Sequence, residues 1–263
     1  MKTALIGYTG FVGSNIMHSA SFTDVYNSKN IHEIEGRSYD LVVCSGVSAV
    51  MWIANKEPEK DWANIQALLN HLSHVKTAQF VHISTVDVYP NPIGVTEEVV
   101  VDPNDNSRPY GKHRLQLELE IKRLFRSLSI IRLPALFGEG IKKNFIYDLI
   151  QNRMLDYTHP DSEFQYYNLR NIWYDILFAL HHSLPTLNIA SEPLKAGVVA
   201  KRALDLDLIP TAEAKALTYN MQTKYDRLRG TSGGYLYHVS QVLPELVDFI
   251  RSQKARLSIT LNP

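Results

Sequence analysis

The stretch "TALIGYTGFVGS", residues 3–14, decides the fold class of this chain. A short apolar run ends at Gly7, and glycines recur at positions 10 and 13, where a helical pattern begins. Glycines at a strand-to-helix turn allow a tight bend and let a phosphate group approach the positively polarised N-terminus of the helix. The stretch predicts a strand over 3–7, a helix over 11–19 and a nucleotide-binding turn between them. The alternative is a tight turn that binds nothing.

Strand and helix signals continue to alternate through the first half of the chain. Further strands are predicted over 22–26, 39–46, 78–84, 128–134 and 184–190. Apolar residues at 3–4 spacing predict an amphipathic helix over 58–75, and a long helix begins at Pro109, where a proline is tolerated in the first turn. This alternation predicts an α/β fold with a Rossmann-type, doubly wound parallel sheet.

The alternation breaks after Pro134, where helical and strand signals no longer take turns. We expect residues 1–133, together with parts of 164–190, to form the nucleotide-binding sheet domain. Residues 134–163 and 191–263 are expected to form a smaller C-terminal cap.

Composition restricts the function classes further. Of 263 residues, 27 are Lys or Arg and 27 are Asp or Glu, so the formal net charge is zero and bulk attraction to nucleic acid or to an anionic membrane is not expected. Cys44 is the only cysteine, which is typical of a reducing compartment. No signal peptide, membrane span or metal-ligand spacing of the ten histidines is recognised, and we expect a cytoplasmic protein without a metal site.

Five stretches after the glycine-rich turn follow one another in a known order. They are "DLVVCSG" (40–46), "DWANIQALLNHL" (61–72), "HISTVDVYP" (82–90), "PYGKHRLQLE" (109–118) and "IIRLPALFGEG" (130–140). Together they resemble the motifs of the extended short-chain dehydrogenase/reductase superfamily, which contains NAD-dependent nucleotide-sugar epimerases, dehydratases and reductases. The resemblance covers about half of the chain and becomes loose in the C-terminal half.

The resemblance implies which residues bind a nicotinamide dinucleotide. The glycine-rich turn, the end of the second strand, the end of the third strand and two helices would contribute to that site. The implied residues are Gly7, Thr9, Gly10, Phe11, Val12, Gly13, Asn27, Ser28, Lys29, Ser45, Gly46, Asn64, Tyr110 and Arg114.

The resemblance also implies a catalytic set of Thr85, Tyr110 and Arg114. A tyrosine has a pKa near 10 and is a poor base at neutral pH, but a fixed cation one helical turn away stabilises the phenolate. Tyr110 could then exchange a proton with a substrate oxygen to which Thr85 hydrogen-bonds. The superfamily has Lys where this chain has Arg114, and the two are not equivalent because arginine is longer, planar and always charged. Without the other motifs, Tyr110 would be read as an ordinary helix tyrosine.

The loop after Thr85 limits the reaction that the resemblance implies. Sugar-nucleotide dehydratases carry two acids directly after the catalytic threonine, whereas this chain has Val86 and Asp87. The acid that would protonate a leaving hydroxyl is therefore missing. Dehydration is disfavoured, and reduction, oxidation or epimerisation is left.

The type of cofactor depends on the end of the second strand. An acid there binds the ribose 2′-hydroxyl of NAD, and a basic residue accommodates the 2′-phosphate of NADP. The segment "YNSKN" (26–30) has no acid after Tyr26, and Asp24 is expected inside the strand. We therefore favour NADP over NAD, although Lys29 could equally be a solvated loop residue.

Substrate contacts are assigned to Asp87, Asn144 and Arg170. The resemblance implies a nucleoside-diphosphate sugar, for which an arginine offers bidentate contact with phosphate. Asn144 and Arg170 could instead be ordinary surface residues. Relatives commonly dimerise through the tyrosine-bearing helix, and the apolar positions of 115–125 allow a homodimer or packing on the sheet.

Three functions remain open at this point. The first is an NAD(P)-dependent oxidoreductase or epimerase that acts on a nucleotide-linked sugar at the cap. The second is a sensor or scaffold protein of the same fold that binds NAD(P) with little catalysis. The third is a reductase of a small non-sugar carbonyl compound.

Overall fold

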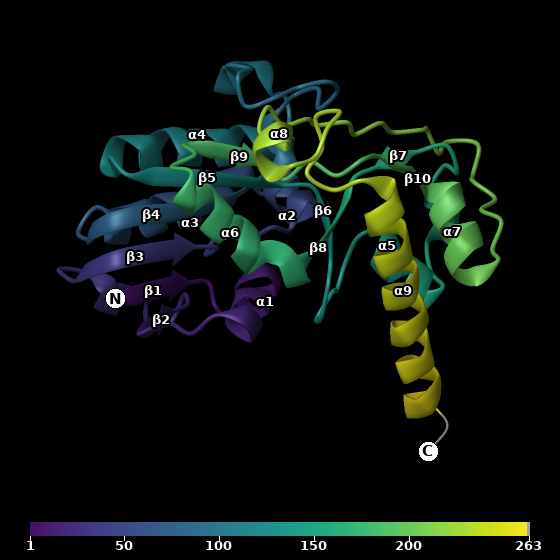
Figure 1. Ribbon diagram of the computed structural model, residues 1–263, viewed down its shortest axis with the longest axis horizontal. Coiled ribbons are helices and arrows are strands. Elements are labelled where there is room, and N and C mark those ends of the chain that lie inside the picture. Colours follow the sequence, from purple (N-terminus) through teal and green to yellow (C-terminus); the bar gives the residue numbers. More distant parts are fainter. Residues whose placement is uncertain (262–263) are drawn as a thin grey trace. The chain divides into compact units, whose positions relative to one another are not determined.

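The computed structural model describes residues 1–261 of the chain (Figure 1). It divides into two compact units. The first comprises Met1–Asn91, Glu97–Leu133 and Arg170–Asn188. The second comprises Pro92–Thr96, Pro134–Leu169 and the chain from Ile189 onward.

A six-stranded sheet forms the centre of the first unit. Its strands are β1 (Thr3–Ile6), β2 (Asp24–Tyr26), β3 (Ser38–Cys44), β4 (Lys76–Thr85), β5 (Leu128–Leu133) and β9 (Thr186–Asn188). All neighbouring strands are parallel, in the order β2-β1-β3-β4-β5-β9. The predicted doubly wound α/β fold is therefore confirmed. Its direction of winding reverses between β1 and β3, which is where such sheets bind ligands.

Helices cover both faces of this sheet (Figure 1). They are α1 (Phe11–Ser19), α2 (Met51–Lys56), α3 (Pro58–Leu72), α4 (Pro109–Leu124) and α6 (Ile172–His181), with 3₁₀ turns η1 (Ile31–Ile34), η2 (Val86–Val88), η3 (Pro103–Asp105) and η5 (Leu169–Asn171). Helices α1 and α6 contact each other, and α2, α3 and α4 contact one another. These two groups lie on opposite faces.

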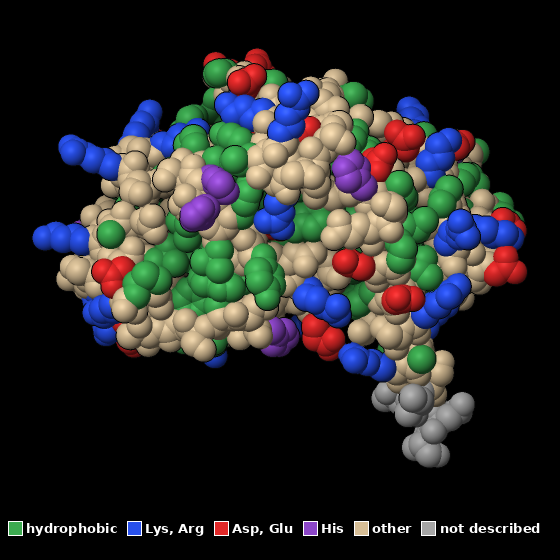
Figure 2. All heavy atoms as spheres, viewed as in Figure 1, with side chains coloured by type: hydrophobic (Ala, Val, Ile, Leu, Met, Phe, Trp, Pro, Cys, Tyr) green, Lys and Arg blue, Asp and Glu red, His purple; other side chains and the backbone are tan. Residues whose placement is uncertain are grey.

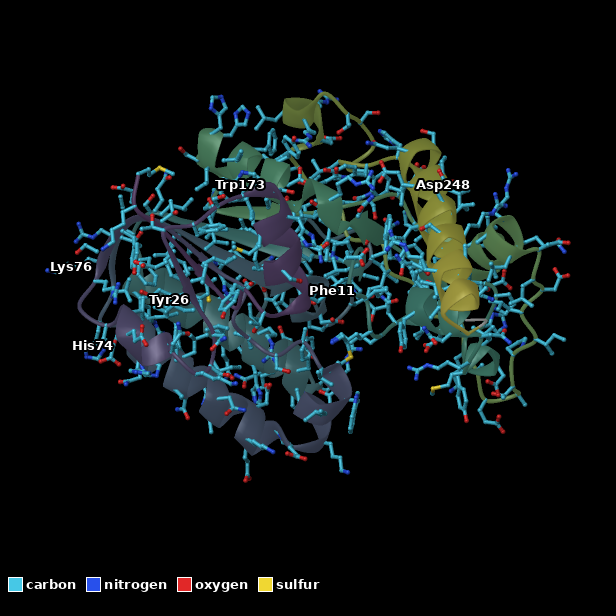
Figure 3. All side chains as sticks on the ribbon, turned by 90° about the horizontal axis from the view of Figure 1, so that it is seen from below. Phe11, Tyr26, His74, Lys76, Trp173 and Asp248 are labelled. Atoms are coloured by element: carbon cyan, nitrogen blue, oxygen red, sulfur yellow. The ribbon has the colours of Figure 1, made fainter. Side chains whose placement is uncertain are left out.

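The core of the first unit lies between the sheet and α3 and α4. Leu117 and Ile121 of α4 are fully buried there, and Phe80 of β4 stacks on Phe125 with ring centroids 4.1 Å apart. Tyr26 of β2 belongs to the same core (Figure 3). The apolar positions of α4 thus pack within the protomer. Homodimerisation through this helix stays a prediction.

The other face of the sheet leaves apolar side chains at the surface around α1 and α6 (Figure 2). Tyr174 and Leu177 of α6 are exposed, and Trp173 packs edge-on against Phe22 with centroids 5.7 Å apart. This surface of the first unit is therefore apolar.

The second unit contains two small sheets and four helices among the described residues. Its elements are β6 (Ala135–Phe137), β7 (Glu163–Phe164), β8 (Tyr166–Asn168), β10 (Leu194–Lys195), α5 (Phe145–Gln151), α7 (Ala196–Leu204), α8 (Asp226–Arg229), α9 (Val239–Leu261) and the 3₁₀ turn η4 (Leu155–Tyr157). Strand β6 pairs with β8 and β7 with β10, and α9 packs on α5 and α7.

The division differs in detail from the boundaries expected from sequence. Residues 92–96 belong to the second unit, because the backbone N–H of Gly94 donates to the carbonyl of Asn220 at 2.8 Å and that of Gln222 donates to Val95 at 2.7 Å. Of the segment 164–190, only parts of which were expected in the sheet domain, residues 164–169 belong to the second unit, where β8 pairs with β6, and residues 170–188 belong to the first. Substrate binding by this unit stays a prediction. Over residues 1–261, no helix is long and apolar enough to cross a membrane.

Candidate active site

The turn between β1 and α1 is built on close backbone contacts. Gly7 has a φ of +87°, and a Cβ there would lie 2.6 Å from the carbonyl carbon of Ser45, at the end of β3. A Cβ on Gly13 would lie 2.1 Å from the carbonyl oxygen of Gly7. Both positions require glycine, one for its left-handed backbone and both for space. The two glycines bring the start of α1 against the carboxyl ends of β1 and β3.

Gly10 has a different environment from the other two glycines. It is the exposed N-cap of α1, and a Cβ there would meet no atom closer than the Gly7 carbonyl oxygen at 3.3 Å. No side chain caps this end of the helix, and Thr9 is also exposed. Phe11 opens the first turn (Figure 3). An exposed helix N-terminus without a side-chain cap, on a helix of nine residues, suits a phosphate, so this cradle fits a dinucleotide.

The ends of the neighbouring strands complete the edge of the sheet. The hydroxyl of Ser45 donates to the carbonyl of Ile6 at 3.1 Å, and Gly46 is exposed beside it. After β2, the amide of Asn27 donates to the hydroxyl of Tyr8 at 3.3 Å, which ties the two loops together. Ser28 and Lys29 are exposed at the tip of the second loop.

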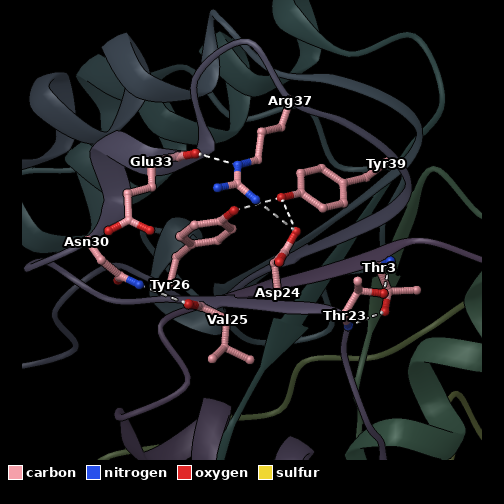
Figure 4. A network of polar contacts seen from close by, with 9 residues as sticks. All are labelled: Thr3, Thr23, Asp24, Val25, Tyr26, Asn30, Glu33, Arg37 and Tyr39. Carbon is pink, nitrogen blue, oxygen red and sulfur yellow. Dashed lines mark hydrogen bonds and ion pairs between the residues drawn. The ribbon is translucent and has the colours of Figure 1, made fainter.

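The acid of β2 is engaged at the opposite end of that strand (Figure 4). Asp24 accepts a hydrogen bond from the hydroxyl of Tyr39 at 2.8 Å, and Arg37 lies 3.5 Å from the same carboxylate oxygen. The hydroxyls of Tyr39 and Tyr26 are 2.7 Å apart. Asp24 lies inside β2, as predicted, and is held away from the carboxyl edge of the sheet.

Thr85 ends β4 and caps the 3₁₀ turn that follows. Its hydroxyl donates to Oδ2 of Asp87 at 3.0 Å and accepts from the backbone N–H of Asp87 at 3.2 Å. Val86, between them, is buried. The local structure therefore fixes the hydroxyl of Thr85 at the carboxyl end of a central strand.

Tyr110 lies in the first turn of α4, directly after Pro109. Its backbone N–H donates to Oδ1 of Asn55 on α2 at 2.9 Å. Gly111 allows α4 to approach the η2 turn, because a Cβ there would lie 2.1 Å from the carbonyl oxygen of Asp87. Asn106 donates to that same carbonyl at 2.9 Å. These contacts bring Tyr110 and Thr85 together.

Arg114 lies one turn after Tyr110 and is 4% exposed. Its guanidinium forms a bidentate pair with Asp61 of α3, with Nη1 to Oδ2 and Nη2 to Oδ1 both at 2.9 Å. Nη2 also donates to the carbonyl of Ser48 at 2.7 Å. The guanidinium carbon lies 4.5 Å from the centroid of the Tyr110 ring. Arg114 is thus held between Asp61 and the tyrosine.

The electrostatics at Tyr110 differ from the expectation from sequence. Burial raises the pKa of Tyr110 to about 12, although the positive charge of Arg114 and hydrogen bonds with Thr85 and Arg114 act to lower it. Asp87 adds to the increase. Arg114 acts on the pKa of Tyr110 in the expected direction, but desolvation of the phenolate outweighs this attraction, so the net pKa is above that of an ordinary tyrosine.

Three further predicted residues are Asn64, Arg170 and Asn144. Asn64 is exposed on α3, three residues after Asp61. Arg170 is exposed in η5. Asn144 belongs to the second unit and caps α5: its Oδ1 accepts from the backbone N–H groups of Ile146 and Tyr147 at 3.0 and 3.3 Å, and its amide donates to Leu136 at 2.8 Å.

Sequence reasoning missed three residues around the tyrosine: Asn55, Asp61 and Asn106. Asn55 accepts a hydrogen bond from the backbone N–H of Tyr110, and Asn106 donates one to the backbone carbonyl of Asp87. Both contacts join residues far apart in the sequence, and no spacing of residues predicts them. Asp61 had a signal, because a buried arginine requires a counter-ion and the helix before it carries acids in its first turn.

Comparisons with solved structures place this fold among known ones. The UDP-glucuronic acid 4-epimerase of Bacillus cereus is 13% identical, with 98% of this chain and all of that chain covered and a TM-score of 0.75. The UDP-N-acetylglucosamine 4-epimerase of Methanobrevibacter ruminantium M1 is 13% identical over 98% of each chain, with a TM-score of 0.73. The dTDP-4-dehydrorhamnose reductase of Bacillus anthracis str. Ames is 15% identical over 95% of this chain and 99% of that one, with a TM-score of 0.72.

Sequence comparison gives a complementary result. No curated protein matches the chain. The family model of the NAD-dependent epimerases and dehydratases matches residues 20–179, more than half of the chain. The match begins after the glycine-rich turn. The chain therefore belongs to the NAD-dependent epimerase/dehydratase family.

Proposed function

We propose that this protein is an NAD(P)-dependent epimerase or reductase that acts on a nucleotide-linked sugar. The observation that carries the proposal is the group formed by Tyr110, Thr85 and Arg114 at the carboxyl edge of a dinucleotide-type sheet. Thr85 and Arg114 both act to lower the pKa of Tyr110, and the guanidinium carbon of Arg114 lies 4.5 Å from the centroid of its ring. A phenol, a hydroxyl and a fixed cation in contact are the parts needed to move a proton at a substrate oxygen.

Each residue has a distinct role in this proposal. Tyr110 gives a proton to the substrate oxygen or takes one from it, and Thr85 hydrogen-bonds the same oxygen. Arg114 stabilises the phenolate that Tyr110 becomes after it has given up its proton. Val86 offers no acid for a leaving hydroxyl, which speaks against dehydration.

The glycine-rich turn is proposed to hold the cofactor. Gly10 and the open first turn of α1 would bind its pyrophosphate, and Asn27, Ser28 and Lys29 would lie near the adenosine ribose. A bound nicotinamide cofactor would supply the hydride acceptor and donor for the reaction. NADP is favoured because Asp24 is engaged with Tyr39 and the loop after β2 offers a lysine and no acid.

The substrate class is proposed from the family to which the chain belongs. The B. cereus epimerase was solved with a UDP-linked fluoro sugar and NAD, and the B. anthracis reductase with NADP. Their low identity carries the fold alone, so a nucleoside-diphosphate sugar is inferred for this chain from its family. Asp87, Arg170 and Asn144 stay predictions as substrate contacts.

The test combines cofactor binding with product analysis. NADPH and NADH are titrated by fluorescence, and UDP- and dTDP-sugars are incubated with each cofactor while absorbance at 340 nm and sugar products are followed. We expect binding of one cofactor and conversion of at least one sugar. Tyr110→Phe should abolish conversion and retain cofactor binding, while Tyr174→Phe on the exposed face of α6 serves as the matched control. Cofactor binding without conversion of any sugar, also in Arg114→Lys, would contradict an enzyme of this class.

A second candidate is a protein that binds NAD(P) with little catalysis. The pair of Arg114 with Asp61 favours it, since a guanidinium bound to a carboxylate has fewer donors for a cofactor ribose than a lysine would have. Turnover of small carbonyl compounds, without affinity for nucleoside diphosphates, would instead indicate a non-sugar reductase.

A further inference from the structure

The partner of Arg114 suggests a role for a residue on another helix. Asp61 is contacted by three donors: Nη1 and Nη2 of Arg114 and, at 2.9 Å, Nδ1 of His113. Its side chain is 9% exposed and that of Arg114 is 5% exposed. A buried, bidentate pair of this kind has a fixed geometry and little freedom to rearrange.

We propose that Asp61 is a positioning residue that fixes the guanidinium of Arg114 on the ring of Tyr110 and weakens the effect of its charge, so that Tyr110 holds its proton more strongly than it would beside an unpaired cation. The carboxylate binds the edge of the guanidinium formed by Nη1 and Nη2, and the ring centroid of Tyr110 lies 4.5 Å from the guanidinium carbon. A cation with an anion bound to it acts on a third group as a dipole, whose field is weaker than that of a lone cation.

The surroundings of Tyr110 agree with this inference. Two charged side chains act on the phenol: Arg114, which favours its ionisation, and Asp87, which opposes it. With Arg114 paired to Asp61, no unpaired cation is left among these groups to draw the proton away. Burial opposes the ionisation of Asp61, but its hydrogen bonds with Arg114 and His113 outweigh this effect and keep the pKa of its carboxyl below the ordinary value. Asp61 is therefore charged at neutral pH.

The consequence for the reaction rests on the proposed function. A protonated tyrosine is the form that donates: its O–H bond breaks as an O–H bond forms on the substrate oxygen, and the phenolate is left beside Arg114. Asp61 would thus prepare Tyr110 as an acid, which suits reduction of a carbonyl group. Without the paired carboxylate, the positive charge of Arg114 would instead favour the phenolate of Tyr110, which is the form that accepts a proton.

The test is the ionisation of Tyr110 in protein without cofactor or substrate. The chain has 14 tyrosines, so tyrosine is labelled with ¹³C at Cζ and the Tyr110 signal is assigned with Tyr110→Phe. In Asp61→Asn, we expect the midpoint to fall by at least about one pH unit, a tenfold increase in acidity. Asp61→Glu should remain close to the wild type. Glu59→Gln, which removes an exposed carboxylate from the same helix, should change nothing.

An unchanged or higher midpoint in Asp61→Asn would overturn the proposal. If this variant does not fold because Arg114 is left unpaired, Asp61→Asn combined with Arg114→Met removes both charges together. The midpoint should then shift by less than about one unit, and an increase of one unit or more would show that Arg114 acts as an unneutralised cation. The titration needs no nucleotide. Its result can therefore contradict the role of Asp61 while the cofactor and sugar test supports the proposed function, and it can support the role of Asp61 while that test fails.

Discussion

At the scale of single residues, two glycines of the first turn are expected to have different roles. Gly13 is needed for stability, and Gly10 is needed for cofactor binding. In Gly13→Ala, the new methyl group would lie 2.1 Å from the Gly7 carbonyl oxygen, so the start of α1 must move. We expect a loss of about 1–3 kcal/mol in the free energy of unfolding, as for other overpacked sites. Urea denaturation measures this loss.

Gly10→Ala should change stability little and should weaken cofactor binding. Its methyl group would lie 3.3 Å from the Gly7 carbonyl oxygen, a tight contact that a shift of a few tenths of an ångström relieves, so the free energy of unfolding should change by less than about 1 kcal/mol. The same methyl group would occupy the exposed side of the turn, where a pyrophosphate would lie, and we expect NAD(P)H affinity to fall at least tenfold, about 1.4 kcal/mol. Equal cofactor binding by Gly10→Ala and the wild type would argue against this turn as the cofactor site.

At the scale of elements, a buried ion pair joins α4 to β5. Glu118 accepts from Nε of Arg132 at 3.0 Å and from Nη2 at 2.5 Å, and the hydroxyl of Ser84 donates to it at 2.6 Å. Glu118 is fully buried, so Glu118→Ala would leave Arg132 as an uncompensated charge. We expect a loss of about 3–5 kcal/mol in the free energy of unfolding.

The same helix provides the control for this prediction. Glu120 and Arg123 form an exposed pair on α4, and Glu120 is only two residues after Glu118. Glu120→Ala should cost less than about 1 kcal/mol, because solvent screens such pairs. Similar losses in the two variants would mean that the buried pair does not stabilise the contact of α4 with the sheet.

The N-terminus of α5 gives a second prediction at this scale. Asn144 has a φ of +84° and bonds two backbone N–H groups and one carbonyl, so Asn144→Ala loses the cap and leaves a strained backbone. We expect a loss of about 1–3 kcal/mol in the free energy of unfolding. Asn171→Ala, at the N-cap of α6 where no side-chain cap bond forms, is the matched control and should change stability little. If Asn144→Ala lowered sugar affinity without lowering stability, Asn144 would be a substrate contact and not mainly a cap.

At the scale of the whole molecule, the sequence predicted the sheet well and the site partly. Buried parallel strands are continuous apolar runs between breakers, and all six were recognisable. The positions of Thr85 and Tyr110 followed from motifs beside such strands. The pairing of Arg114 with Asp61 joins two residues that are 53 positions apart in the sequence, and the net pKa of Tyr110 depends on burial. Neither is encoded in a local pattern.

Acid stability of the molecule depends on a histidine that sequence reasoning treated as incidental. His82 of β4 is 1% exposed, and neither ring nitrogen has a hydrogen-bond partner within residues 1–261. Burial lowers its pKa to about 4, against a smaller opposing effect of Glu118. Between about pH 6.5 and 4 the unfolded chain therefore binds a proton that the folded protein does not, so the free energy of unfolding falls as pH falls through this window. At about 1.4 kcal/mol per pH unit, the loss is about 3 kcal/mol.

Urea denaturation from pH 7 to pH 4.5 checks this prediction. His82→Leu removes the titrating group, so its stability should fall less steeply, and the difference from the wild type should grow as the pH is lowered. His18→Gln, at an exposed position of α1, should follow the wild type. Asp61 does not interfere: its pKa is lowered from 3.8, so its contribution is present above that value and is lost only at lower pH. Parallel curves for His82→Leu and the wild type would show that His82 is protonated, or hydrated, inside the folded protein.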